Sequence, residues 1–155
     1  MSALIYGCVT NPITGQSQFS FVGKSQLLAL AREAVPSQFS ADYGVVNDPA
    51  LNAYVSQVGR KLVATLKPTD VVYQDMPFSF QVVNAVYVNA YAFPDGTIAV
   101  TRGMIAEIEN EAQLAAVLGH EIAHVNCGHT AAAISKRTLY DALVSGTAGY
   151  LACKG

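Results

Sequence analysis

The spacing of apolar residues in the first half of the chain predicts two amphipathic helices. Apolar positions recur about every 3.6 residues over 24–34, and the pattern resumes after Pro36 through 39–43. A second helix is expected over 49–66, because Asp48 is a suitable N-cap and proline suits the first helical position. Each helix would turn one apolar face toward a shared core.

The period of the apolar positions changes from 3.6 to two in the middle of the chain. Apolar and polar residues alternate over 78–82, and 89–93 and 97–101 have similar composition. The sequence Pro-Asp-Gly at 94–96 predicts a tight turn between the last two, because glycine accepts a positive φ. We therefore expect three strands in a small antiparallel sheet.

Helical patterns return in the last third of the chain. A short helix is expected over 104–108 and a longer one over 111–126, for which Asn110 is a good N-cap. A final helix rich in small residues is expected over 130–150. The predicted fold class is therefore α+β, with helices packed around a small antiparallel sheet.

Composition and charge narrow the class of protein. Of the residues, 52% are hydrophobic and 13% are charged, and this composition excludes a disordered polymer. The length of 155 residues is sufficient for one domain with a hydrophobic core. The formal net charge is -2 and the nine Lys and Arg residues are scattered, so we expect no nucleic-acid partner. No apolar run reaches the roughly 18 to 20 residues of a membrane-spanning helix.

The first 23 residues are expected to form an extended leader. Residues 4–8 read Leu-Ile-Tyr-Gly-Cys, which is similar to the cleavage box of bacterial lipoproteins, in which the cysteine is acylated. Cys8 is therefore a candidate lipidation site, and the alternative is an ordinary thiol near the terminus. Cys127 and Cys153 have no metal-ligand spacing, and Cys127 is expected to be a small buried residue.

The three histidines of the chain fall within ten residues, and two of them form a motif with chemical meaning. His120, Glu121 and His124 follow the pattern H-E-x-x-H. At about 100° per residue the two histidines lie on one helix face, so both imidazoles can reach one tetrahedral zinc. Glu121 flanks that face, where its carboxylate can accept a proton from water activated by the metal.

The remaining ligands of such a metal are less evident from the sequence. On a continuing helix His129 would lie about 140° around from His124, so we expect it to be a structural residue or to orient a metal ligand rather than to bind metal itself. Cys127 would point off the ligand face. Asp141 is the only acidic residue after His124 and is either a third ligand or a surface carboxylate. A purely structural two-histidine site is disfavoured, because structural zinc usually has four protein ligands.

Several segments together resemble peptidase family M48, which includes HtpX, the CAAX prenyl proteases and periplasmic zinc peptidases. The similarity rests on 89–96, 100–103 and 110–124. Upstream, 43–49 and 54–59 are similar to the soluble bacterial branch of this family, whose members often begin at a lipoprotein cysteine.

The resemblance implies a zinc-dependent endopeptidase of the gluzincin type with one zinc per chain. His120 and His124 would be the ligands and Glu121 the general base. The strand containing Asn89, Ala90 and Tyr91 matches a family segment beside the cleft, where an extended polypeptide could add as another strand. The alternative is a sheet strand without substrate contact.

The resemblance also implies a location and substrates. Relatives of this type work in the bacterial cell envelope, so we expect a periplasmic protein or an outer-membrane lipoprotein anchored through Cys8. Its substrates would be unfolded or misassembled envelope proteins.

The sequence departs from the family pattern at the third ligand. The family uses a Glu on a later helix, whereas Glu121 is the last Glu of this chain. We therefore expect 24–155 to be the N-terminal portion of a metallopeptidase domain. The alternative function is a non-catalytic binding or chaperone-like module that retains the peptidase fold.

Overall fold

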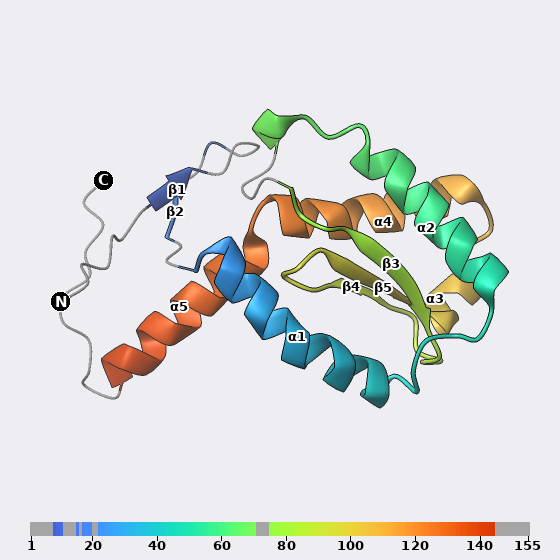
Figure 1. The fold of residues 1–155 in the computed structure, drawn as a ribbon, viewed down its shortest axis with the longest axis horizontal. Helices are drawn as coiled ribbons and strands as arrows, with labels where there is room; N and C mark the ends of the chain where they lie inside the picture. The colour runs from blue at the N-terminus through green and yellow to red at the C-terminus, as the bar shows by residue number, and fades with distance from the viewer. Residues whose placement is uncertain (1–7, 11–14, 16, 20–21, 71–74, 145–155) are drawn as a thin grey trace.

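The computed structural model describes residues 8–10, 15, 17–19, 22–70 and 75–144 (Figure 1). The helices are α1 (Lys24–Ala41), α2 (Pro49–Val63), α3 (Arg102–Glu107), α4 (Glu111–Asn126) and α5 (His129–Val144), with a 3₁₀ turn at Pro68–Asp70. The strands are β1 (Cys8–Thr10), β2 (Ser17–Phe19), β3 (Ser79–Val83), β4 (Ala90–Ala92) and β5 (Thr97–Thr101). The predicted α+β class is confirmed.

The central sheet has the strand order β3-β5-β4 and is mixed, so the prediction of an antiparallel sheet is wrong. β5 pairs antiparallel with β4, with Tyr91 opposite Ala99, as the turn at 94–96 requires. It also pairs with β3, but in parallel, with Phe80 opposite Ile98. The loop between β3 and β4 carries the chain past the position that β5 then fills. Apolar periodicity indicates which face of a strand is buried but not which strands are neighbours.

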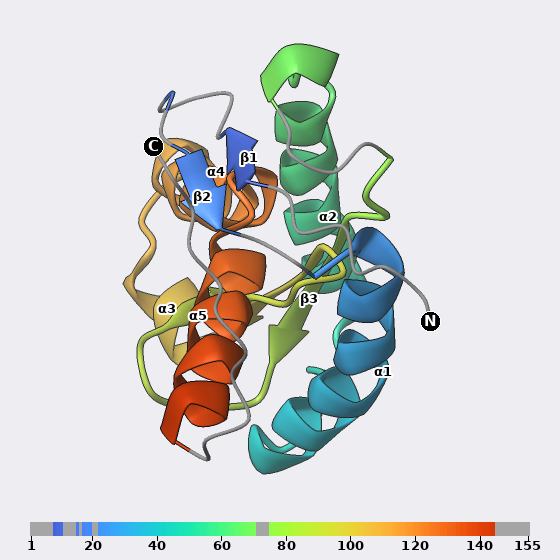
Figure 2. The ribbon, with the colours of Figure 1, turned by 90° about the vertical axis from the view of Figure 1, so that its left-hand side faces the viewer.

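The sheet lies between two layers of helices. One face packs against α2 and α4 and the other contacts α1 (Figures 1 and 2). Side chains alternate between the two faces as the pleat demands. The core between the sheet, α2 and α4 consists of Val55, Val58, Phe80, Val82, Ile98, Val100, Leu114, Leu118 and Ile122.

The helix boundaries follow the predicted caps closely. The Asp48 side chain accepts a hydrogen bond from Leu51 N at 3.0 Å, and Asn110 accepts one from Gln113 N at 3.0 Å. α1 continues through Pro36 instead of pausing there. None of the helices described is long and apolar enough to cross a membrane.

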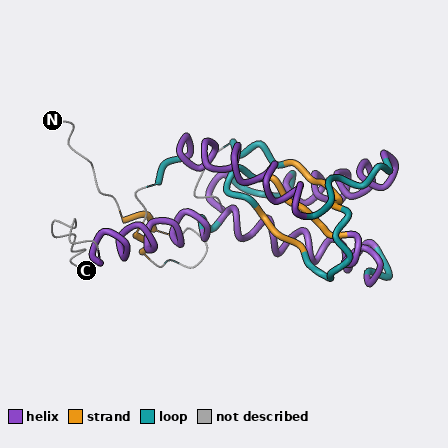
Figure 3. The backbone as a smooth tube through the Cα atoms, turned by 90° about the horizontal axis from the view of Figure 1, so that it is seen from below, coloured by secondary structure: helices purple, strands orange, loops and turns teal. Residues whose placement is uncertain are grey.

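The two ends of the chain differ from the sequence prediction in detail. Part of the expected extended leader forms a ladder, in which β1 pairs antiparallel with β2 and Cys8 lies opposite Phe19. This pair lies at the same end of the molecule as α5 (Figure 3). α5 begins one residue before the predicted helix, and residues 145–150 of that prediction lie outside the described residues.

A glycine in α2 lets this helix approach the sheet closely. A Cβ atom at Gly59 would lie 2.4 Å from Cε1 of Phe80, a ring that is only 2% exposed. Gly59→Ala is therefore expected to lower the free energy of unfolding by about 1–3 kcal/mol, through overpacking. Urea denaturation would measure this change.

Gly119 in α4 is the matched control, because a Cβ atom there would meet nothing within 4 Å. Gly119→Ala is expected to leave stability unchanged or to raise it by up to about 1 kcal/mol, since alanine is the better helix former. If both substitutions had the same effect, close packing at Gly59 would not be the cause.

Candidate metal and catalytic site

His120 and His124 lie one turn apart on α4, with their rings side by side. Their Nε2 atoms are 3.0 Å apart, and the ring centroids are 4.6 Å apart. Two nitrogens bound to one tetrahedral zinc at about 2.0–2.1 Å lie about 3.3 Å from each other. The two imidazoles therefore have nearly the separation that two zinc ligands need.

His129 contacts His124 from the start of α5. α4 ends at Asn126, and the chain turns through Gly128, whose φ of 64° is in the left-handed region. Figures 1 and 2 show the change of direction between α4 and α5. Nδ1 of His129 consequently lies 2.8 Å from Nδ1 of His124. The angle of about 140° does not apply here, because it holds only on a continuing helix and α4 ends at Asn126.

The hydrogen-bonding pattern of His124 suits a metal ligand. A neutral imidazole carries one proton, and the tautomer that donates from Nδ1 to His129 leaves the Nε2 lone pair facing His120. Metal-bound histidines commonly donate their second ring nitrogen to a partner that fixes the ring. His129 is positioned to be that partner, although its role stays a prediction.

Glu121 lies beside an open cavity together with part of the predicted substrate strand. The cavity has a volume of 460 Å³ and is lined by Asn89, Ala90, Met104, Ala116, Val117, His120 and Glu121. Glu121 is 9% exposed, whereas His120 is exposed to solvent. The Glu121 carboxylate therefore borders the same cavity as His120 and the predicted strand residues Asn89 and Ala90.

The sequence prediction missed three residues that line this cavity. Ala116 and Val117 precede His120 by four and three positions, so helical periodicity places them on the same face. Their small or branched apolar side chains carry no chemical signal of their own. Met104 comes from α3, and no pattern in the sequence connects it with His120.

Tyr91 is the one predicted substrate residue that does not line the cavity. Its side chain packs on the opposite face of the sheet, against the same buried cluster as Phe39 of α1, and its ring contacts that of Phe93. There its hydroxyl donates a hydrogen bond to Asp42. Any role of Tyr91 toward a substrate would therefore involve its backbone.

Asp42 is a buried carboxylate at the end of α1 that collects three side-chain donors. Burial alone raises the pKa of this carboxyl, but hydrogen bonds from Tyr91, Gln38 and Tyr87 outweigh burial and lower the pKa below its ordinary value. The pKa of Tyr91 is raised by burial and by its bond to Asp42. The pKa of Tyr87 is raised first by its hydrogen bond to Asp42, at 2.8 Å, and then by burial.

The described residues do not supply a complete set of protein ligands for a metal ion. No three His, Cys, Asp or Glu side chains in the described ranges cluster around one point. The three histidines form a chain, because His124 contacts its two neighbours through different ring nitrogens. Cys127 is buried, as the sequence predicts. Asp141 belongs to α5, but its side chain lies outside the description, as does that of Cys8.

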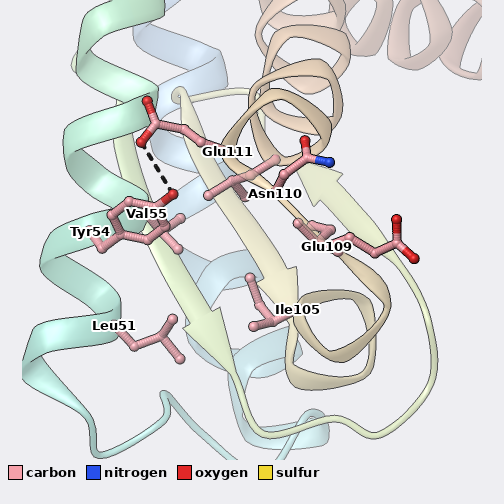
Figure 4. Close-up of a pocket in the computed structure, with 9 residues that line it drawn as sticks. Leu51, Tyr54, Val55, Ile105, Glu109, Asn110 and Glu111 are labelled. Carbon is pink, nitrogen blue, oxygen red and sulfur yellow. Dashed lines mark hydrogen bonds between the residues drawn. The ribbon is translucent and has the colours of Figure 1, made fainter.

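A second, smaller cavity lies between α2, α3 and the start of α4. Its volume is 200 Å³, and Figure 4 shows Leu51, Tyr54 and Ile105 around it. The Tyr54 hydroxyl donates to Glu111 at 3.2 Å, and Lys61 forms an ion pair with the same carboxylate. None of the predicted site residues borders this cavity.

Comparison with known proteins identifies a family and several relatives. The model of peptidase family M48 matches residues 49–155. The beta-barrel assembly-enhancing protease of Yersinia pestis is 34% identical over 100 residues, which are 64% of this chain and 20% of that protein. The protein of the same name from Escherichia coli (strain K12) is 34% identical over 90 residues, or 58% of this chain and 18% of that protein.

A mitochondrial relative extends the similarity to a larger part of the chain. Human metalloendopeptidase OMA1 is 32% identical over 124 residues, which are 78% of this chain and 23% of that protein. The chain thus spans about a fifth of the length of these relatives.

Proposed function

The chain belongs to peptidase family M48, and from this premise we propose that it contributes the active-site helix of a zinc-dependent metalloendopeptidase of the gluzincin type. The observation that carries this function is the arrangement of His120, His124 and Glu121 on α4 beside a cavity bordered by β4. The two imidazoles would hold one zinc ion per chain, and the donor set fits that ion because imidazole nitrogen is a common zinc ligand. A bound zinc lowers the pKa of water and polarises a peptide carbonyl.

The protein side chains around the cavity divide the remaining work. The Glu121 carboxylate would take the proton of the attacking water and later give it to the leaving amine. His129 would hold His124 in the tautomer that presents Nε2 to the metal. A catalytic zinc usually has a third protein ligand, and a carboxylate in that position remains a prediction.

The substrate would be an extended polypeptide. Among the described strands, β4 is an edge of the sheet, so one side of its backbone has no strand partner. A peptide that adds to this edge would gain main-chain hydrogen bonds and would pass the cavity lined by Asn89, Ala90 and Glu121.

The names of the relatives support a role in the bacterial cell envelope. The Yersinia and Escherichia proteins are named for the assembly of beta-barrels. We propose that the substrates are unfolded or misassembled envelope proteins and that the protein works in the periplasm. Acylation of Cys8, with anchoring in the outer membrane, belongs to the same proposal.

Metal removal tests the proposed chemistry. The protein expressed from its complete reading frame is expected to bind one zinc per chain and to hydrolyse casein. Chelation with phenanthroline should abolish hydrolysis, and added zinc should restore it, since the water needs the metal for activation. Zinc content measured by mass spectrometry and casein cleavage measured on gels would check both parts.

Histidine variants provide the control for this experiment. His120→Ala and His124→Ala should each retain less than about a tenth of the wild-type zinc, because each removes a ligand. His129→Ala should weaken zinc binding by about 10–100-fold, as expected for a residue that supports a ligand. Zinc-independent cleavage would contradict the proposal, and client binding without any cleavage would support the chaperone-like alternative.

A further inference from the structure

The loop between β3 and β4 presents a group of exposed apolar side chains. Val86, Tyr87 and Val88 are 73%, 46% and 55% exposed. Tyr43 and Val45 are also exposed, but Val45 bridges to Val83 of β3 at the edge of the sheet opposite β4, so they do not belong to this group. We call Val86, Tyr87 and Val88 the apolar loop patch. Large apolar side chains gathered on a surface often mark a binding site.

The backbone that carries the patch is firmly held. The hydroxyl of Thr101, a fully buried residue, donates to the carbonyl of Tyr87 at 2.6 Å and accepts from Asn89 N at 3.1 Å. A Cβ atom at Gly103 would lie 2.2 Å from the carbonyl oxygen of Val86, so the loop packs directly on the start of α3. The apolar side chains therefore cannot retract into the core without breaking these contacts. A binding surface fixed in this way loses little entropy when a ligand docks.

The patch is continuous with the cavity of the candidate site. Residue 88 is followed directly by Asn89 and Ala90, which line the cavity together with His120 and Glu121. A polypeptide strand added to the edge of β4 would extend beyond Ala90 toward the loop. Every second side chain of such a strand would face the cavity side of the sheet, whereas the Tyr87 hydroxyl points to the other side, where it donates to Asp42.

The charge and the size of the patch argue against two other partners, an anionic membrane and a second copy of the chain. The segment 84–89 contains no Lys or Arg, and the adjoining start of α3 contributes one basic residue, Arg102, whereas proteins that bind anionic membranes use clusters of basic residues. A stable contact between two copies of a chain usually involves about 20–30 residues on each side, far more than this patch provides. An extended apolar peptide fits both the size and the composition.

We propose that the apolar loop patch binds apolar side chains of the same extended polypeptide that β4 holds at the cavity, which makes it a specificity surface for unfolded apolar segments. This inference deepens the proposed function and rests on it. The partner is therefore a polypeptide rich in aliphatic side chains, as are the core segments of a protein that has not yet folded.

Peptide binding to the metal-free protein tests this inference without any need for catalysis. The probes are a fluorescein-labelled ten-residue peptide with Leu at every second position and a matched peptide with Ser in place of each Leu. Fluorescence anisotropy should show that the wild type prefers the Leu peptide, and that Val86→Ser combined with Val88→Ser weakens its binding about tenfold. Affinity for the Ser peptide should be the same in both proteins.

A double variant at other exposed apolar positions serves as the control. Leu30 of α1 and Tyr140 of α5 are 45% and 67% exposed, and neither belongs to the loop. Leu30→Ser combined with Tyr140→Ser should bind the Leu peptide like the wild type, and circular dichroism should show that both double variants are folded. Equal binding by the wild type and the loop variant, or equal losses in both double variants, would overturn the inference.

Two further measurements distinguish a peptide partner from a second copy of the chain and from a membrane. The casein assay distinguishes this inference from the proposed function. Sedimentation that reveals a dimer lost only in the loop variant would overturn the inference in favour of a second copy. Binding of the wild type, but not the loop variant, to phosphatidylglycerol vesicles would overturn it in favour of a membrane. If peptide binding behaves as expected while casein is never cleaved, the patch stands as a peptide-binding surface and the proposed function fails.

Discussion

Replacing Glu121 with glutamine is expected to lower casein hydrolysis by about 10³-fold and to leave the zinc content of the protein unchanged. Glutamine keeps the size and shape of the side chain, which is 9% exposed at the border of the cavity, but it cannot accept a proton. General bases contribute about 10²–10⁴-fold to such reactions. Because the neighbouring histidines are untouched, metal binding and catalysis should separate in this variant.

Glu107→Gln is the matched control for the Glu121 experiment. Glu107 is an exposed residue of α3 and does not line the cavity, so its replacement should leave both hydrolysis and zinc content unchanged. Initial rates of casein cleavage and zinc content should be measured for all three proteins in parallel. A Glu121→Gln protein that retained more than about a tenth of the wild-type rate would remove Glu121 from the role of general base.

The local structure of α4 could be predicted from the sequence because its signals are local. Asn110 caps α4 as predicted, and the i, i+4 spacing is sufficient to bring His120 next to His124. Such features depend on a single helical segment and on its 3.6-residue period. The same reasoning applies to Asp48 at the start of α2.

Features that depend on how separate segments meet were not accessible in this way. The parallel pairing of β3 with β5 arises from the path of the intervening loop, which apolar periodicity does not encode. The position of His129 depends on a single left-handed glycine, Gly128, at which the chain changes direction. A glycine directly before a histidine was visible in the sequence, but its φ was not.

The orientation of the Tyr91 side chain could have been predicted from the alternation of side chains along a strand. Successive residues of a strand point to opposite faces, so Ala90 and Tyr91 cannot both face the same cavity with their side chains. Ala90 lines the cavity, and Tyr91 packs toward α1. Its partner Asp42 lies 49 positions away in the sequence, and no local pattern joins the two.

Replacing Asp42 with alanine is expected to lower the free energy of unfolding at pH 7 by about 3 kcal/mol or more. The carboxylate is 3% exposed and accepts hydrogen bonds from Tyr87, Tyr91 and Gln38, so it ties the end of α1 to β4 and to the loop before it. Hydrogen bonds to a charged group contribute about 1.5–3 kcal/mol each, and the truncated variant would leave two partly buried hydroxyls without their acceptor. Urea denaturation followed by circular dichroism would measure the loss.

Asp48→Ala provides the matched control, because this exposed carboxylate makes one capping bond and its loss should cost only about 1 kcal/mol. The pH dependence of the free energy of unfolding then distinguishes the contribution of the Asp42 charge from that of its side-chain shape. Since the folded-state pKa of Asp42 is lowered, its contribution is present above the unfolded pKa of about 3.9 and is lost as the pH falls through the folded value. The stability difference between the wild type and Asp42→Asn should therefore be constant from about pH 5 to 7 and should shrink below about pH 4. A difference that stayed constant down to pH 2 would show that the negative charge of Asp42 does not stabilise the fold.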